Sequence, residues 1–376
     1  MVVDATSTLH QPATKGRSLW ADAWRRLKAN KAAVVSGVYL ILMTLVCVVG
    51  PYFSMHSYDA VYPDFVKVPA SLEAYPTKDM IEPNIKDALS RGRMELVEWE
   101  RDSGRILVTA KSDRELDERY GRYLARASSF KDVKLEALSD DKKTAVFSAQ
   151  VQELYFFFGT DPNGRDLLTR TLIAGRISLS IGLLAGLVAL LIGVTYGAIA
   201  GFVGGRTDNI MMRIVDILYS LPFIFFVIML VVFFGRNFVL MFIAVGAVLW
   251  LDMARIVRGQ TLTIKAQEYV TAAGALGVSQ IGILWRHVIP NTLGPVVVFV
   301  TLLVPHVIIL ESFLSFLGLG VQEPLTSWGV LISQGARNIP GSNWLLFFPS
   351  FFLTTTLFAL NFIGDGLRDA LDPKDR

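Results

Sequence analysis

Apolar and polar residues occur along the chain in long blocks rather than in a short alternation. The first apolar block, Ala32 to Phe53, has no charged residue, and about 20 such residues are enough to cross the hydrocarbon of a bilayer. The block is long for a signal peptide, and no A-x-A-like cleavage site follows it. We therefore expect an uncleaved first membrane span over residues 32–53.

Five further apolar blocks follow, and together with the first they predict six membrane helices. The blocks are Ile177–Val203, Ile214–Phe234, Phe238–Ala254, Thr292–Leu319 and Trp344–Ile363. The Ile177–Val203 block is rich in Gly and Ala, as expected of a helix that packs closely against its neighbours in lipid. Asp216 and Pro222 interrupt the next block. Because six is even, we expect both termini on the same side of the membrane.

The stretch 54–158 is polar, with many charges, several prolines and no spanning run. SDRELDERYGRYLARAS, residues 112–128, has a helical pattern with a Ser start signal. GRILVTAK and TAVFSAQVQELYFFF, residues 104–111 and 144–158, have the composition of strands. We expect a small α+β domain here, and a long ordered loop is the alternative.

The N-terminal stretch 1–31 combines a polar tail with an amphipathic segment. Residues 1–16 are unpatterned, which is typical of disorder. In RSLWADAWRRLKANK the apolar residues fall near one helical face and the basic residues near the other: Leu19, Trp20, Trp24 and Leu27 against Arg25, Arg26 and Lys28. This pattern is typical of a helix in the membrane interface, and an ordinary basic flank of the first span is the alternative.

The distribution of Lys and Arg predicts the orientation, because cytosolic flanks of membrane spans are enriched in both. In a six-span arrangement, the following basic residues lie on one side of the membrane: Arg25, Arg26, Lys28, Lys31, Arg206, Arg213, Arg255, Arg258, Lys265, Arg286, Arg368, Lys374 and Arg376. The last loop on the other side, 320–343, has only Arg337. Arg165, Arg170 and Arg176 depart from the rule, but they end a long translocated segment, where the rule is weak. We expect cytosolic termini, a periplasmic 54–158 stretch and an inner-membrane location.

Composition narrows the possible chemistry. The chain is 52% hydrophobic and 18% charged, which favours a membrane protein, and its net charge of +3 is too small to suggest nucleic acid. The single cysteine, Cys47, allows neither an intrachain disulfide nor a cysteine-based metal site. No GxxxxGK[ST], HExxH or GxSxG motif is present. We expect no enzyme activity, no metal and no cofactor in this chain.

The stretch EYVTAAGALGVSQIGILWRHVIPN, residues 268–291, predicts a helix–turn–helix between two apolar blocks. Gly277 lies where a helix end needs a left-handed residue, Ser279 can cap a second short helix, and Pro290 can start the next span. The small residues of the first helix form a patch: Ala272, Ala273 and Gly274. A small patch allows the close approach of another protein, although a plain connecting loop is the alternative from these residues alone.

The same stretch resembles the cytosolic EAA loop of the membrane subunits of bacterial ATP-binding-cassette (ABC) importers. That pattern is E-A-A, three residues, Gly, nine residues and I-x-L-P. Its counterparts are Thr271-Ala272-Ala273, Gly277 and His287-Val288-Ile289-Pro290, and Thr271, His287 and Ile289 depart from it. The RH(V/I)xPN ending, from Arg286 to Asn291, resembles the peptide-importer branch.

Three further stretches resemble the same branch in order along the chain. GTDPNGRDLLTRTLIAGRISLSIGL (159–183) is similar to GTDxxGRDxxSRxxxGxRxSLxxG. GGRTDNIMMRIVDILYSLP (204–222) is similar to GGxxDxxxMRxxDxxxxxP. ESFLSFLGLGVQEPLTSWG (311–329) is similar to ExxLSFLGLGxxPPxxSWG, with Glu323 where Pro is common. The resemblance covers residues 17–53 and 159–376, whereas the 54–158 insert is longer than expected there.

The resemblance implies an all-α polytopic membrane protein with the type I ABC importer permease fold, here with an α+β insert. It implies the C-type permease subunit of a dipeptide or oligopeptide importer, paired with a homologous permease. Two ATPase subunits, which bind ATP, would dock on the two EAA loops, and a periplasmic binding protein would deliver the peptide. For the coupling loop, residues 265–291, the implied contact residues are Glu268, Tyr269, Ala272, Ala273, Gly277, Arg286, His287 and Pro290.

Polar residues within the predicted spans are candidates for the translocation pathway, because a charge at the bilayer centre costs about 3 kcal/mol. The candidates are Pro305, His306, Glu311 and Ser315. Glu311 either lines the pathway or caps the periplasmic end of its span, and His306 fits a packing role as well as a cavity. Asp216 and Arg213, three apart, are expected to pair with each other.

Other functions stay open at this point. Nickel, opine, glutathione or sugar permeases would share the scaffold, and His306 alone is weak support for a metal. A secondary transporter would use buried Asp, Glu or His and often inverted repeats, but no repeat is visible. A membrane-embedded hydrolase would need a nucleophile and a base within the spans.

Overall fold

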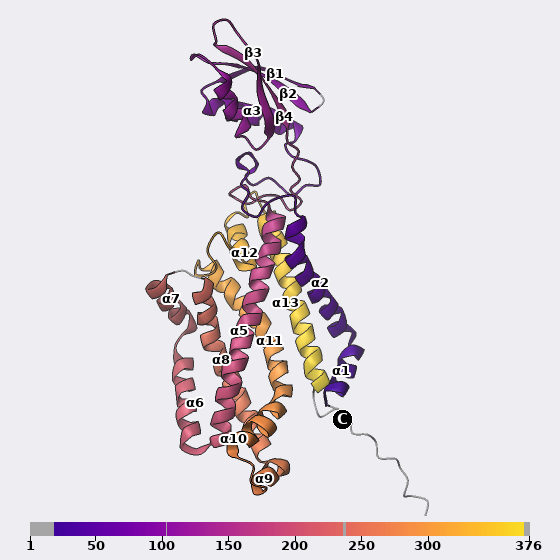
Figure 1. Ribbon diagram of the computed structural model, residues 1–376, viewed down its shortest axis with the longest axis vertical. Helices are drawn as coiled ribbons and strands as arrows, with labels where there is room; N and C mark the ends of the chain where they lie inside the picture. Colours follow the sequence, from indigo (N-terminus) through magenta and orange to yellow (C-terminus); the bar gives the residue numbers. More distant parts are fainter. Residues whose placement is uncertain (1–18, 103, 236–237, 372–376) are drawn as a thin grey trace, which may run out of the picture.

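The computed structural model describes residues 19–102, 104–235 and 238–371, which form a bundle of long helices with a small α/β domain at one end (Figure 1). We call that end of the bundle the insert end and the opposite end, where α9 and α10 lie, the foot. The expectations for residues 1–16, for the side chains of Leu19 and Trp20, and for Lys374 and Arg376 lie outside the described residues.

The bundle is built around one long helix, α5, which packs against α2, α8 and α11. Its helices are α1 (Leu19–Ala29), α2 (Lys31–Phe53), α5 (Leu167–Val203), α6 (Gly205–Ser220), α7 (Phe223–Phe234), α8 (Phe238–Lys265), α9 (Glu268–Ala275), α10 (Gln280–Ile283), α11 (Ile289–Phe316), α12 (Trp328–Arg337) and α13 (Trp344–Leu371). Most extend beyond the predicted apolar blocks at one end, where more polar turns continue the helices.

Within the described residues, four helical segments are long and apolar enough to cross a membrane. They are Lys31–Phe53, Leu167–Val203, Gln280–Phe316 and Trp344–Leu371. The pair α6 and α7, bent by 79° at the break before Pro222, makes a fifth when it is counted as one span. The structure thus supports a multi-pass helical protein with four or five candidate spans, fewer than the six that the sequence predicts.

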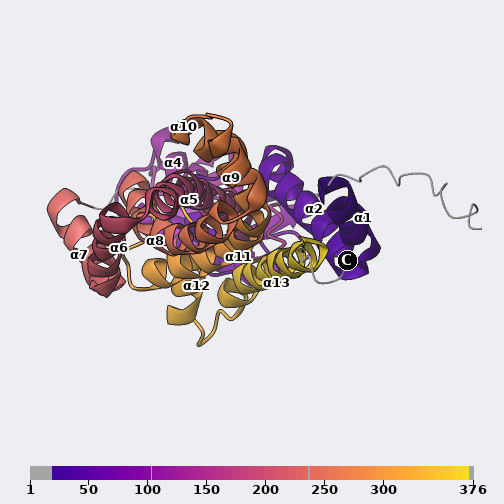
Figure 2. The ribbon, with the colours of Figure 1, turned by 90° about the horizontal axis from the view of Figure 1, so that it is seen from below.

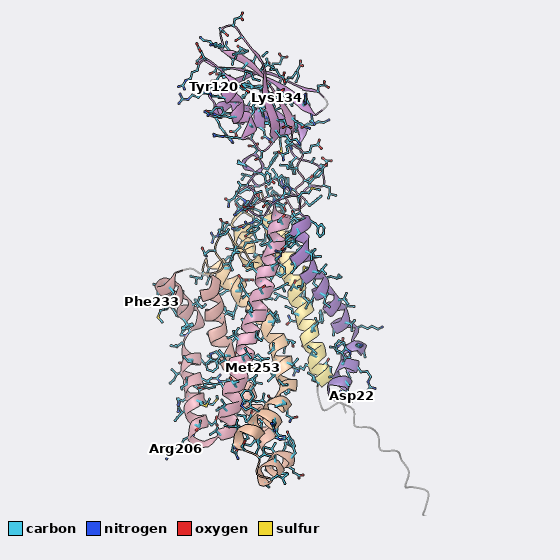
Figure 3. The ribbon with its side chains drawn as sticks, viewed as in Figure 1. Asp22, Tyr120, Lys134, Arg206, Phe233 and Met253 are labelled. Carbon is cyan, nitrogen blue, oxygen red and sulfur yellow. The ribbon has the colours of Figure 1, made fainter. Side chains whose placement is uncertain are left out.

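Small residues allow α5 to approach its neighbours closely. A Cβ atom on Gly197 would lie 2.3 Å from the carbonyl oxygen of Ala254 in α8, and one on Gly175 would lie 2.4 Å from Sγ of Cys47 in α2. At the edge of the bundle the side chain of Phe233 points outward, whereas Met253 lies within it (Figure 3). This arrangement is typical of helices packed in lipid.

The α/β domain is a four-stranded antiparallel sheet in the order β1-β2-β4-β3 with helices packed against it. Its elements are α3 (Lys78–Arg91), β1 (Glu95–Asp102), β2 (Arg105–Lys111), α4 (Gly121–Ala125), β3 (Phe130–Leu138) and β4 (Thr144–Val151). Its core includes Ile85, Leu89, Ile106, Val108 and Phe147, all fully buried.

Two elements expected in this domain are shorter in the structure than the sequence predicts. The helix expected over 112–128 is only a 3₁₀ turn, Glu118–Tyr120, followed by α4, because Asp117 rather than Ser112 caps it. Ser112 is buried and donates a hydrogen bond to the carbonyl of Arg93 at 3.2 Å. The second expected strand ends at Val151, because the chain turns there into the segment that leads back to the bundle.

Two irregular segments, 54–77 and 152–166, join the domain to the bundle, and we call them the stalk. Tyr75 and Leu154 pair across them through two backbone hydrogen bonds of 2.7 and 2.8 Å. Phe65 and Phe156 are fully buried between the segments. The stalk therefore has a small apolar core of its own, which fixes the start of α5.

Candidate functional site

The turn between α9 and α10 has the local geometry that the sequence predicts. Gly277 has a φ of +81°, in the left-handed region. The Val278 amide donates to the Ala273 carbonyl at 3.1 Å, and the Gly277 amide donates to the Gly274 carbonyl at 3.0 Å. These two bonds are those of a Schellman motif. Ser279 then caps α10, because its Oγ accepts a bond from the Gly282 amide at 3.2 Å.

The chain beyond α10 differs from the expected separate second helix. A π-helical turn, Leu284–Val288, follows α10 and runs directly into α11, so that Gln280–Phe316 is one continuous helix. Pro290 is the second residue of α11 rather than a break. A proline lacks the N–H for the usual backbone bond, and the wider π turn before it accommodates that loss. The foot is therefore continuous with a long bundle helix.

One face of the foot is packed into the bundle. Val270, Ala273, Ile283, Leu284 and Val288 are buried in one cluster with residues of α5 and α8. Ala273 is thus a packing residue and not part of an exposed patch, since its Cβ faces the bundle. Ala272 and Gly274 are exposed, as are Glu268, Arg286 and Pro290, and His287 is half-buried.

The other face of the foot exposes large apolar side chains, which sequence reasoning missed apart from Tyr269. Leu276 is 84% exposed, Ile281 72%, Trp285 55% and Tyr269 45%. They come from α9, the turn, α10 and the π turn, at the end of the bundle shown from below in Figure 2. Leu276 and Ile281 flank the Gly277 turn and are only five residues apart in the sequence. Their spacing alone therefore gave a weak signal for this surface.

Polar contacts hold the helices next to the foot together. Lys265 of α8 donates to the carbonyl of Phe202 near the end of α5 at 2.5 Å. Arg258 of α8 binds both carboxylate oxygens of Asp208 in α6, each at 2.6 Å. Asp216 was expected to pair with Arg213 but pairs with Arg255 of α8 at 2.8 Å. The expected pair does not form because the carboxylate faces α8.

Glu311 lies in a buried junction near the insert end, where α5, α11 and α12 meet. Its side chain is fully buried, and its Oε1 accepts bonds from the hydroxyls of Ser315 and Ser327, each at 2.6 Å. Ser327 caps α12, and Ser178 of α5 accepts a bond from the Trp328 amide at 3.2 Å. Glu311 thus connects three helices from the inside.

Pro305 and His306 are consecutive in α11 but differ in exposure. Pro305 is buried within the bundle, whereas His306 is exposed. The structure therefore does not bring the four pathway candidates together: Glu311 and Ser315 share the buried junction, and His306 lies on the outer surface of the chain, more than a helical turn away.

A cluster of charged side chains holds the stalk end of α5 to the α11–α12 loop. Arg165 donates to Asp161 at 2.8 Å and to Glu323 at 2.7 Å. The Arg170 guanidinium, 1% exposed, lies 3.4 Å from Asp161, and Tyr58 donates to the carbonyl of Pro324. The hydrogen bond from Arg165 keeps the pKa of Glu323 below its usual range. Glu323, which departs from the family pattern, is thus an ion-pair partner here.

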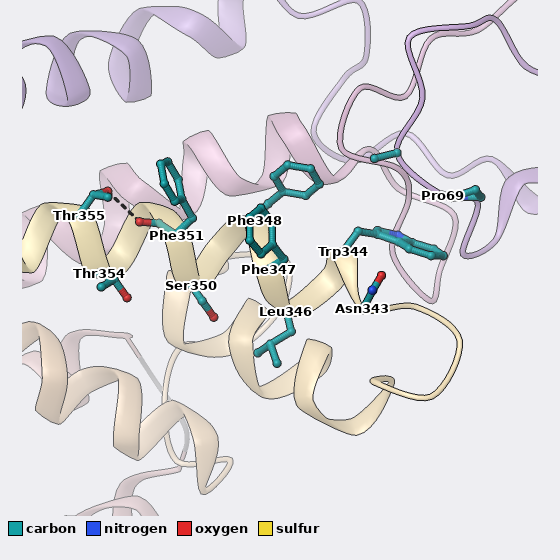
Figure 4. A pocket seen from close by; sticks show the side chains of 11 residues that line it. Pro69, Asn343, Trp344, Leu346, Phe347, Phe348, Ser350, Phe351, Thr354 and Thr355 are labelled. Atoms are coloured by element: carbon teal, nitrogen blue, oxygen red, sulfur yellow. Dashed lines mark hydrogen bonds between the residues drawn. The ribbon is translucent and has the colours of Figure 1, made fainter.

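A hollow of about 820 Å³ lies at the insert end of α13. Trp344, Phe347, Phe348 and Phe351 of α13 form its wall, and Pro69 of the stalk borders it (Figure 4). Phe348 also stacks on Phe158 with ring centroids 4.0 Å apart. The hollow is therefore an aromatic groove between the bundle and the stalk.

Comparisons with known proteins agree with these features. Residues 193–376 match the family described as the inner membrane component of binding-protein-dependent transport systems, and residues 18–70 match the N-terminal transmembrane domain of oligopeptide transport permease C. The oligopeptide transport system permease protein OppC of Escherichia coli (strain K12) is 45% identical over 362 residues, 96% of this chain and 93% of that protein.

Two further relatives are similar over nearly the whole chain. OppC of Haemophilus influenzae is 43% identical over 96% of this chain and 91% of its own length. The dipeptide transport system permease protein DppC of Lactococcus lactis subsp. cremoris is 35% identical over 99% of this chain and 94% of its own length. These matches show that the chain belongs to the family of inner-membrane permease subunits of peptide ABC importers, which are transport proteins and not themselves enzymes.

Proposed function

We propose that this chain forms half of the translocation pathway of an ATP-driven peptide importer and transmits the movement of ATPase subunits through its foot. The exposed apolar surface of the foot, Tyr269, Leu276, Ile281 and Trp285, is the observation that carries this proposal. The relatives named for oligopeptide or dipeptide transport support peptides as the substrate class. Among the described residues no three His, Cys, Asp or Glu gather as a metal site would require, so nothing in the geometry favours nickel.

The foot fits the role of a lever. Its inner face is packed against α5 and α8, and its outer half is continuous with α11 through the π turn. A force applied to Leu276 or Ile281 would therefore act directly on a helix of the bundle. Apolar side chains exposed to water are costly unless a partner covers them, and the partner proposed here is an ATPase subunit, which supplies the ATP-binding site that this chain lacks.

The test is a substitution within that surface. Leu276→Asp places a charge where an apolar contact is proposed, so we expect the ATPase subunits to be lost from the purified complex. Leu138→Asp, a matched change in the α/β domain at another exposed leucine, should leave them bound. Normal recovery of the ATPases and normal peptide uptake with Leu276→Asp would refute the proposed docking surface.

Six spans with cytosolic termini are part of the same proposal. The sixth span is α8, which is 28 residues long and begins with the apolar stretch Phe238–Ala254. In this arrangement the foot faces the cytosol and the α/β domain the periplasm. In a Cys47→Ser background, an impermeant thiol reagent should label a cysteine at exposed Ser90 in cells with a permeabilised outer membrane, but not one at exposed Ser279. The reverse pattern would refute this orientation.

The other partners proposed are a homologous permease in the membrane and a periplasmic binding protein that delivers the peptide. The α/β domain stands beyond the insert end of the bundle (Figure 1), which places it beside the proposed docking site of the binding protein. We expect replacement of residues 78–151 by a short Gly/Ser linker to weaken the apparent affinity for the binding protein. The stalk stays intact in that variant. Unchanged affinity and maximal uptake rate would show that the domain has no docking role.

A further inference from the structure

A second groove, of about 500 Å³, runs along the foot half of the bundle between α8, α11 and α13. Its walls are mainly apolar and include Ile256 of α8 and, from α11, Pro295, Val298, Phe299 and Leu302. Arg368, in the last turn of α13, lines the end near the foot. Among the described residues, the lining is thus mainly apolar, with the guanidinium of Arg368 near its foot end.

Polar side chains lie beyond the other end of this groove. His306 follows Leu302 by four residues on α11, and Asp252 precedes Ile256 by four residues on α8. Residues four apart share a helix face, so both side chains continue the lining. Arg255, three residues after Asp252 on α8, shares this side of the helix with it.

Of these charged groups, Arg255 alone takes part in an ion pair that the structure describes. Arg255 is already bound to Asp216 at 2.8 Å and lies over the ring of Tyr219 at 4.3 Å. Within the described part of the chain, Asp252, His306 and Arg368 take part in no salt bridge or side-chain hydrogen bond. Ionisable residues within membrane helices are rare and usually functional, so an acid without a bonded partner there indicates a functional site.

We propose that this groove holds the peptide during its passage, with Asp252 facing the terminal ammonium and Arg368 the terminal carboxylate. The inference rests on the proposed function, since it names where that substrate is bound. An acid at one end and a guanidinium at the other complement a zwitterion, and apolar walls accept side chains of varied shape. His306 adds a polar contact at the Asp252 end.

The dimensions give the length of peptide that contacts both ends. Pro295 and His306 are 11 residues apart on α11, which is about 16 Å along a helix. An extended chain covers about 3.5 Å per residue. A peptide of about four or five residues therefore fits the groove with both termini engaged, and a dipeptide engages one end only.

The experiment measures protection of a cysteine placed in the groove of the whole importer complex. Val298→Cys in a Cys47→Ser background changes the groove volume little, and its reaction with a thiosulfonate reagent is followed with and without tetra-alanine. At twice its Kd the peptide should slow labelling about threefold. Tetra-alanine with acetyl and amide caps should protect much less, and so should free tetra-alanine when Asp252→Asn or Arg368→Gln is added.

Matched controls separate this inference from the proposed function. Leu293→Cys, on another face of α11 and outside the groove lining, should label at a rate that peptide does not change. Arg213→Gln, which removes an exposed cation of α6, should leave the protection at position 298 unchanged. Peptide uptake without protection at position 298, or equal protection by the capped peptide, overturns the groove assignment while the importer function stands. Absence of uptake by the unmodified complex would instead contradict the function itself.

Discussion

The α/β domain and helix α5 of the bundle differ in the side chains that they bury. The domain buries large apolar residues such as Ile106, Leu89 and Phe147 and exposes its charges, as a water-soluble domain does. In the bundle, α5 buries glycine and alanine along its length and exposes Leu183 and Leu191, at 68% and 57%. Residue types that fill the core of the domain thus also occur on the outer surface of α5.

This difference follows from the solvent that each part meets. In water, burying apolar area drives folding, at about 25 cal/mol per Å². In lipid that drive is absent between helices, and close packing and polar contacts hold them together. The bundle should therefore be most sensitive to added volume at its small residues, and the domain to lost volume in its core.

The largest expected effect is from added volume between α5 and α8. A Cβ on Gly197 would lie 2.3 Å from a backbone oxygen of α8, so Gly197→Val cannot be accommodated by a side-chain rotation. Overpacking a rigid contact costs about 3 kcal/mol or more, and we expect little folded protein. The yield of monodisperse protein on size-exclusion chromatography in detergent measures this.

Gly259→Ala is the matched control for that change. A Cβ at Gly259, also in a helix of the bundle, meets nothing within 4 Å, so the yield should equal that of the wild type. Wild-type yield and melting temperature for Gly197→Val would contradict the packing argument for lipid-embedded helices.

The second effect is from lost volume in the domain. Phe147 is fully buried in the sheet, and Phe→Ala in a core costs about 3–5 kcal/mol. Phe147→Ala should unfold the α/β domain but leave the bundle folded, because the stalk has its own apolar core. Limited proteolysis should cut within residues 78–151 and spare the helices. Loss of the whole protein would show that the bundle depends on the domain.

At the foot we expect a substitution to cause a smaller loss of stability and a specific loss of function. A β-branched residue in the left-handed conformation of Gly277 costs about 1–2 kcal/mol, and Gly277→Val should therefore misplace the foot. We expect ATP hydrolysis to continue with reduced peptide uptake per ATP, measured in proteoliposomes with the complete importer. Gly277→Asn, which tolerates this conformation better, should lose less. Wild-type coupling with valine would exclude this role for the turn.

The sequence predicted the structural features that depend on residues close together in the chain. The Gly277 turn, the Ser279 cap and the apolar blocks all arise from residues a few positions apart. Contacts between distant segments were not predictable. Asp216 forms an ion pair with Arg255 of α8, and Glu311 accepts a hydrogen bond from Ser327 at the start of α12. Ala273 was assigned to a surface because periodicity alone does not say which face of a short helix a neighbouring helix covers.

The domain shows the same limit. β2 and the start of β4 have clear strand composition, but β1 and β3 carry many charges, such as Glu98, Glu100, Lys131 and Lys134. They are the outer strands of the sheet, where both faces meet water in part and the alternation of apolar and polar residues is weak. Edge strands are often charged for this reason, which hides them from pattern reasoning.

The smallest expected effect is at the Arg165–Glu323 pair, where the two parts of the molecule meet. Glu323 is 51% exposed, so its ion pair is worth about 1 kcal/mol or less. Because the pKa of Glu323 in the folded protein lies below its ordinary value, the stabilisation is present at neutral pH and is lost as pH falls through the folded-state pKa. Glu323→Gln should therefore lower the melting temperature slightly at pH 7, and the difference should vanish in acid. Glu115→Gln, at a carboxylate 77% exposed in a 3.8 Å pair, should show no shift at either pH. A Glu323→Gln shift that persists unchanged in acid would mean that shape, not charge, holds the α11–α12 loop to the stalk.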